Sequence, residues 1–153
     1  MINYFSKLFD YDKAASIKLL DLMTTSGTAP YETVKIFAHM MAAQNTWLLR
    51  AKKLNAPGGP LWPDSTLEEL RPSIISHHAA WKEWLNGQSD DILTSTVSYQ
   101  NSAGTEFNTA ITDVITQVLN HGTHHRGQIG IYLKQAGLQL PGTDHILFSR
   151  GLL

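Results

Sequence analysis

The sequence contains no cysteine, and this absence narrows the chemistry that is open to the protein. Without cysteine there is no disulfide, no thiolate nucleophile and no covalent attachment site for a c-type haem. Any metal site must therefore draw its ligands from histidine, carboxylate or amide oxygen, or water.

Long apolar runs and an excess of basic residues are also missing. No stretch reaches the ~20 apolar residues of a transmembrane helix, and the first residues lack the positive start and apolar core of a signal peptide. The 12 lysines and arginines are balanced by 13 aspartates and glutamates, so no excess of positive charge attracts nucleic acid. We expect a cytoplasmic protein that binds neither membrane nor nucleic acid and whose 153 residues form one domain.

Apolar residues recur at helical spacing in four segments, a pattern that predicts an all-α four-helix bundle. The expected helices cover residues 3–24, 31–54, 65–86 and about 108–136. We expect Ser65 and Glu68 to form a capping box at the start of the third helix and Gly137 to follow the end of the fourth.

The segments between the helices carry turn and strand signals. Residues 55–64 are rich in proline and glycine, which predicts a loop whose Leu61 and Trp62 fold back on the bundle. Thr94–Tyr99 and Glu106–Thr109 are β-prone and flank a turn sequence, so they predict a small β-hairpin or irregular excursion before the fourth helix.

Three of the seven histidines lie close together in the fourth helix. His121 and His125 stand one turn apart on one face, an arrangement typical of metal chelation, whereas His124 points to the side and is the weaker candidate. Histidine pairs at this spacing also arise by chance. Burying two unpartnered imidazoles in an otherwise apolar row is costly, however, and a metal ion removes that cost.

The same helix contains three glycines in its interior, Gly122, Gly127 and Gly130. Each costs about 1 kcal/mol relative to alanine. We therefore expect another group to approach the helix backbone closely there.

His39 lies in the middle of the apolar face of the second helix. A lone histidine in such a place is more often a core residue with satisfied hydrogen bonds. Together with His121 and His125, however, it makes a set of three imidazoles from two helices, which a cation accepts while keeping open positions. The residues thus predict a metal site formed by His39, His121 and His125.

Other polar residues fall on or near apolar faces. Asp12 lies on the apolar stripe of the first helix, and two interpretations are open: a solvated or capping carboxylate at the bundle end, or a carboxylate near the cation. His77 and His78 lie beside Trp81 and Trp84, and we expect packing or surface roles for both.

As a set, these residues resemble the DinB-like (DinB/YfiT-like) superfamily. Residues 120–128 match its fourth-helix signature, residues 38–48 resemble its second-helix motif with a histidine and a downstream tryptophan, and residues 136–144 are similar to its tail. Residues 11–16 are similar to its first-helix pattern Tyr-Asn-x-Trp-Ala-Asn, from which they depart at three positions, Asp12, Ala14 and Ser16.

The resemblance implies an up-up-down-down bundle, a homodimer, and a divalent cation held by His39, His121 and His125. It also implies a thiol-dependent transferase or a hydrolase that acts on a small-molecule substrate. Zinc or nickel is the expected metal ion. A thiol would have to arrive with a low-molecular-weight cofactor such as bacillithiol, mycothiol or glutathione, because the chain has no cysteine. Candidate pocket residues around the site are Tyr11, Asp12, His124 and Gln128.

Two other accounts of the same residues are open. The protein could be a non-catalytic dimeric stress or interaction module with a structural metal ion, in which Trp62 and the tail around Phe148 form a partner surface. It could also be a helical bundle with core histidines and no metal ion. A zincin and a di-iron carboxylate bundle are both excluded, because the chain has neither His-Glu-x-x-His nor Glu-x-x-His.

Overall fold

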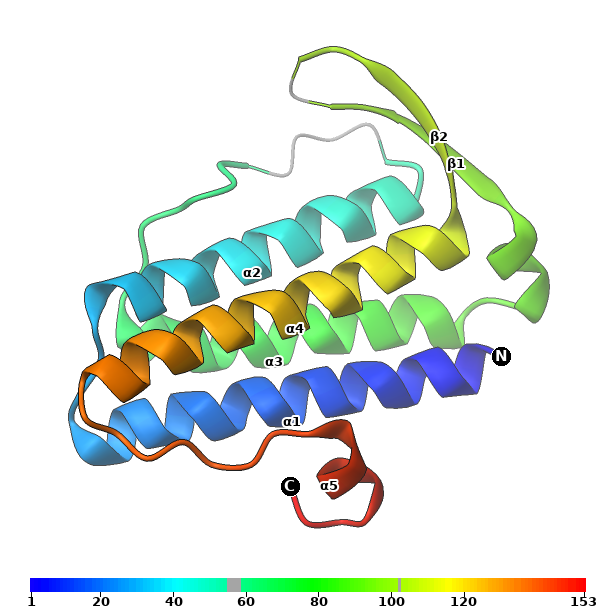
Figure 1. Ribbon diagram of the computed structural model, residues 1–153. Helices are drawn as coiled ribbons and strands as arrows, with labels where there is room; N and C mark the ends of the chain where they lie inside the picture. The colour runs from blue at the N-terminus through cyan, green and yellow to red at the C-terminus, as the bar shows by residue number, and fades with distance from the viewer. Residues whose placement is uncertain (55–58, 102) are drawn as a thin grey trace.

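The computed structural model describes residues 1–54, 59–101 and 103–153. It contains four long helices that lie side by side (Figure 1), α1 (Ile2–Ser26), α2 (Tyr31–Ala51), α3 (Leu67–Asn86) and α4 (Ile111–Gln135). Before α4 come a 3-10 helix, η1 (Asp90–Thr94), and two antiparallel strands, β1 (Thr96–Gln100) and β2 (Glu106–Ala110); after α4 comes the short helix α5 (His145–Ser149). The expected four-helix bundle with a hairpin before its last long helix is confirmed.

The helix directions follow from the lengths of the connections. α1 and α4 run one way and α2 and α3 the other way (Figure 1), which gives the order up, down, down, up. The expected up-up-down-down order differs from this because residues 27–30 are too few to carry the chain back along the bundle, so α2 must run opposite to α1. Residues 52–66 are enough to span the ~30 Å length of α2, and the parallel crossover lies there.

The helix ends match the sequence signals closely, with small shifts. The capping box at the start of α3 is formed by Thr66 and Glu69, one residue later than the expected pair, and Ser65 Oγ donates to the same Glu69 carboxylate at 3.2 Å. α4 begins only at Ile111, because the residues before it are held in β2 by pairing with β1. Gly137 follows α4 in the left-handed conformation, φ 85°, as expected.

Parts of two expected loops, residues 55–58 and 102, lie outside the described residues. Next to the first of them, Leu61 and Trp62 do contact the bundle as expected, through His39 of α2. In the described part of the chain, no helix has both the length and the apolar character needed to cross a membrane.

The core consists of two apolar clusters with a polar layer between them. One cluster gathers around Phe9, Trp81 and Val114, and the other around Leu20, Met40 and Ile129. All four long helices place buried or half-buried polar side chains between the two clusters, namely Asp12, Ser16, His39, Gln44, His78, His121, His125 and Arg126. Because buried polar groups need hydrogen-bond partners, the side chains of this layer must contact one another specifically, and a functional site is expected there.

Candidate metal centre

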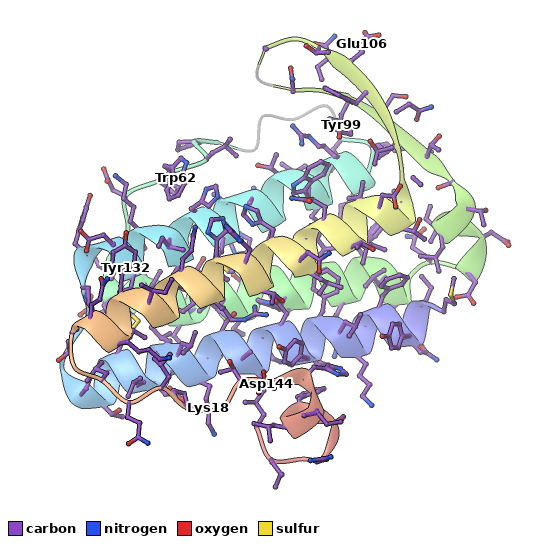
Figure 2. All side chains as sticks on the ribbon, in the orientation of Figure 1. Lys18, Trp62, Tyr99, Glu106, Tyr132 and Asp144 are labelled. Atoms are coloured by element: carbon purple, nitrogen blue, oxygen red, sulfur yellow. The ribbon has the colours of Figure 1, made fainter. Side chains whose placement is uncertain are left out.

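Three imidazoles meet between α2 and α4. His39 Nε2 lies 3.2 Å from His121 Nε2, which in turn lies 3.0 Å from His125 Nε2. One possible ligand nitrogen from each ring lies within 4.8 Å of the other two. Figure 2 shows the region, on the side of the bundle that carries the labelled Trp62. The structure therefore brings together all three residues that the sequence predicted as metal ligands.

Hydrogen bonds orient two of these rings. His39 Nδ1 donates to the carbonyl oxygen of Leu61 at 2.6 Å, and His125 Nδ1 donates to Gln128 Oε1 at 2.6 Å. A neutral imidazole has a single N–H, so the Nε2 atoms of His39 and His125 direct lone pairs toward the shared centre. Converging lone pairs repel one another unless a cation lies among them, and a donor set held this way fits a divalent metal ion.

The electrostatics of the site favour the neutral form of His121 and His125. Burial, together with the nearby His125 and His39, lowers the pKa of His121 to about 4. Burial also lowers the pKa of His125, although its hydrogen bond to Gln128 works in the opposite direction. Because metal ions bind imidazole only in its neutral form, these rings are ready to act as ligands at neutral pH.

Trp62 covers one side of the cluster. Its ring stacks on His39 with the centroids 3.8 Å apart and the planes at 8°, and it meets His125 edge-on at 6.5 Å. Half of the Trp62 side chain is nonetheless exposed. The indole thus shields the His39 ring from water and, with Leu61, fixes its orientation.

Asp12 is neither a solvated or capping residue nor a member of the histidine cluster. Its side chain is 1% exposed and accepts hydrogen bonds from Arg126 Nη1 and from Gln44 Nε2, the latter at 3.1 Å. His78 Nε2 lies 2.8 Å from Asp12 Oδ2, the oxygen that also accepts the hydrogen bond from Gln44. Burial would raise the pKa of Asp12, but the Arg126 guanidinium and the His78 contact outweigh it and hold this pKa below its usual value.

This network lies directly behind the face of α4 that carries His121 and His125. A Cβ atom at Gly122 would come within 2.5 Å of Asp12 Oδ1, so the absence of a side chain there lets the carboxylate reach Arg126. Of the other two interior glycines, Gly130 is approached by Leu140 as expected, whereas Gly127 has no such neighbour and that expectation is wrong for it.

Sequence reasoning missed the partner of His78. The residue is fully buried, which agrees with the packing role expected for it, but its contact with Asp12 was not foreseen. The signal that could have found it was the position of Asp12 on an apolar stripe, because a carboxylate in a core requires a partner from another helix.

The remaining candidate pocket residues have separate places. Tyr11 donates its hydroxyl proton to the carbonyl oxygen of Thr143 at 3.0 Å and packs against Phe148, so it fastens the C-terminal tail. His124 is exposed, and its Nε2 lies 3.2 Å from Gln128 Nε2. Its ring also meets that of His125 edge-on, with the centroids 5.1 Å apart. Gln128 is the one of these residues that forms a hydrogen bond with the histidine cluster.

A cleft of about 1380 Å³ opens onto His39 and His121. It runs between the second half of α2, the hairpin and α4, and its wall includes Arg50, Tyr99 and Gln117. None of these was singled out from the sequence, because the cleft exists only once the hairpin lies over the helices. The arrangement gives a small molecule a route to the imidazoles.

Comparisons with known proteins support the resemblance to the DinB-like superfamily. The DinB family matches the chain over residues 28–151, a region that contains His39, His121 and His125. "Protein DinB" of Bacillus subtilis (strain 168) is 34% identical over 61 residues, which cover 40% of this chain but only 36% of that relative. No solved structure matches the chain.

Proposed function

This chain belongs to the DinB family, and on that premise we propose that it is a metal-dependent enzyme whose divalent ion, zinc or nickel, is held by His39, His121 and His125. The convergence of three imidazole nitrogens at one point carries the proposal. The reaction class we propose is thiol-dependent group transfer or hydrolysis of a small-molecule substrate.

The cation would act as a Lewis acid, which would lower the pKa of a coordinated water to about 7 or hold a thiol as its thiolate. Three protein ligands leave a coordination position for such a group. The chain's own residues do the rest: Leu61 and Gln128 orient two rings, Trp62 keeps water from one side, and the cleft admits substrate at His39 and His121.

A thiol substrate must come from solution, because the chain has no cysteine. Low-molecular-weight thiols such as bacillithiol, mycothiol or glutathione fit this requirement. A homodimer and a cytoplasmic location stay predictions of the sequence, and light scattering of the purified protein tests the first of them.

The test is a rate measurement on untagged protein loaded with zinc or nickel. Thiols are offered with a chromogenic electrophile, and nitrophenyl esters are offered separately. We expect a rate above the uncatalysed background that chelation abolishes and that His125→Ala lacks. His77→Ala is the control, because this ring lies on α3, its Nδ1 donates to the carbonyl oxygen of Ser73 in the same helix at 2.7 Å, and its loss should leave the rate unchanged. Stoichiometric metal binding without acceleration of either reaction would overturn the enzymatic proposal.

The three ligands also join α2 to α4, which favours a second candidate, a non-catalytic module with a structural ion. Melting with and without chelator separates the two. A structural ion contributes directly to folding, so its removal should collapse the bundle. For the enzyme we expect the metal-free bundle to stay folded, because two apolar clusters hold all four helices on either side of the polar layer.

A further inference from the structure

We propose that the cleft beside the histidine cluster binds an elongated organic acid, with its carboxylate at Arg50 and its other end at the imidazoles. The proposal concerns the half of the cleft that lies away from the metal centre. Only the binding of the ligand's other end at the imidazoles rests on the proposed metal-dependent function.

The positions of His39 and Arg50 on α2 define the length of the ligand. They lie eleven residues apart, which is about three helical turns and ~16 Å of rise, and so they fall on nearly the same face. Both line the cleft, as do Ala43 and Thr46 between them. Helical side chains lean toward the N-terminus, so the long Arg50 side chain reaches back along the cleft and shortens the span.

Aromatic rings hold the Arg50 guanidinium at the hairpin end of the cleft. Its central carbon lies 4.6 Å from the centroid of Trp47 and 4.3 Å from that of Tyr99, and Tyr99 is stacked on Phe107. These contacts partly desolvate the cation and restrict its movement. A guanidinium held in this way loses little further freedom when it binds an anion.

No carboxylate lies within ion-pairing distance of Arg50 among the described residues. In the part of the chain that the structure describes, the guanidinium donates one hydrogen bond, a long one of 3.4 Å, to the carbonyl oxygen of Gln100. By contrast, Arg71 and Arg126 of the other helices each have an aspartate partner. Arg50 therefore keeps most of its N–H donors available for an incoming group.

The charge around the hairpin end of the cleft has the sign that an anion needs. The lining of the cleft includes two cations, Arg50 and Lys53, and one carboxylate, that of Glu106. This carboxylate already accepts a hydrogen bond from Gln100 Nε2 at 3.3 Å. The planar guanidinium fork matches a carboxylate with two parallel hydrogen bonds. A molecule with a remote carboxylate and a metal-binding atom such as a thiol sulfur would complement both ends of the cleft.

Calorimetric titration with a matched pair of probes tests this. Mercaptooctanoic acid carries a thiol and a remote carboxylate, and mercaptooctanamide has the same chain with a neutral end. In the wild-type protein we expect the acid to bind about tenfold more tightly than the amide, the value of one charge-assisted contact at ~1.4 kcal/mol. Arg50→Gln should reduce this ratio to near one while the affinity for the amide is unchanged.

Two further variants act as controls. Arg50→Lys keeps the charge but lacks the fork, so it should retain part of the preference, and Lys53→Gln removes an exposed cation at the same end and should retain most of it. Circular dichroism verifies that each variant is folded. A wild-type ratio below about threefold, or a tenfold ratio that survives Arg50→Gln, would overturn the proposal.

The same titrations in zinc-loaded and metal-free protein separate this proposal from the metal-dependent function. The carboxylate preference should be present in both forms. The advantage of mercaptooctanoic acid over octanoic acid should appear only with zinc. Loss of that advantage alone contradicts thiol binding at the metal centre, whereas loss of the carboxylate preference alone contradicts the role of Arg50.

Discussion

Removing the Asp12 carboxylate should cost far more stability than an ordinary surface substitution. In Asp12→Ala the Arg126 side chain, 5% exposed, loses the only carboxylate that contacts it in the described residues. Breaking a buried ion pair by deleting one partner costs about 3–5 kcal/mol. For a chain of this size that corresponds to a decrease in Tm of roughly 6–20 °C. Urea denaturation followed by circular dichroism measures the free energy of unfolding directly.

Asp10→Ala is the matched control, two residues away on the same helix. Asp10 pairs with Lys82 at 2.6 Å, but about a third of each side chain is exposed, so its loss should cost about 0–1 kcal/mol. If the free energies of unfolding of the two variants differ by less than about 1 kcal/mol, Asp12 and Arg126 do not stabilise the fold as a buried ion pair.

The effect of Asp12 should also depend on pH in a defined direction. Burial would raise its pKa, but Arg126 and His78 hold it below the ordinary value of 3.8. A carboxyl whose pKa is lowered by folding stabilises the native state above its unfolded pKa and loses that contribution as the pH falls through the folded value. The stability difference between wild type and Asp12→Ala should therefore be complete at neutral pH and shrink below about pH 4. A difference that grows on acidification would contradict this assignment.

Further substitutions test how the site is built. Gly122→Ala places a Cβ atom 2.5 Å from the Asp12 carboxylate and should lower the free energy of unfolding by about 1–3 kcal/mol. Gly127→Ala meets no atom within 4 Å and should raise the free energy of unfolding by up to about 1 kcal/mol. Thermal melts that fail to separate the two variants would refute the close approach at Gly122. Gln128→Leu removes the oxygen that accepts the Nδ1 proton of His125, and we expect zinc affinity to fall about 10–100-fold in a competition titration with a chromogenic chelator. An unchanged affinity would show that this hydrogen bond does not orient the ring.

The histidine site could be predicted from sequence because local periodicity contains most of the information. His121 and His125 share a face in an α-helix, and His39 is conspicuous in an apolar stripe. The hairpin could also be predicted from local sequence, because two β-prone segments flank a turn. That His39 of α2 meets the histidines of α4 was inferred from the resemblance to a known superfamily and from the requirement that buried imidazoles have a partner.

The residues that were misjudged depend on how the helices pack. The contact of Asp12 with His78 requires α1 and α3 to align at one level, and no spacing within either helix specifies that alignment. The direction of α2 depends on a connection length rather than on any motif. The role of Arg50 could not be predicted from sequence, because it depends on the hairpin placing Tyr99 beside the guanidinium. Tertiary register, which periodicity cannot supply, accounts for what was missed at Asp12 and Arg50.

The most direct measurement is a calorimetric titration of untagged, metal-free protein with zinc and with nickel. The proposed site takes one ligand nitrogen from each of His39, His121 and His125, which come from two helices. We predict that one ion binds per chain and that His39→Ala loses most of the affinity while the bundle stays folded. A wild-type protein that binds neither ion, or a His39→Ala variant that binds as tightly as wild type, would contradict the metal centre itself.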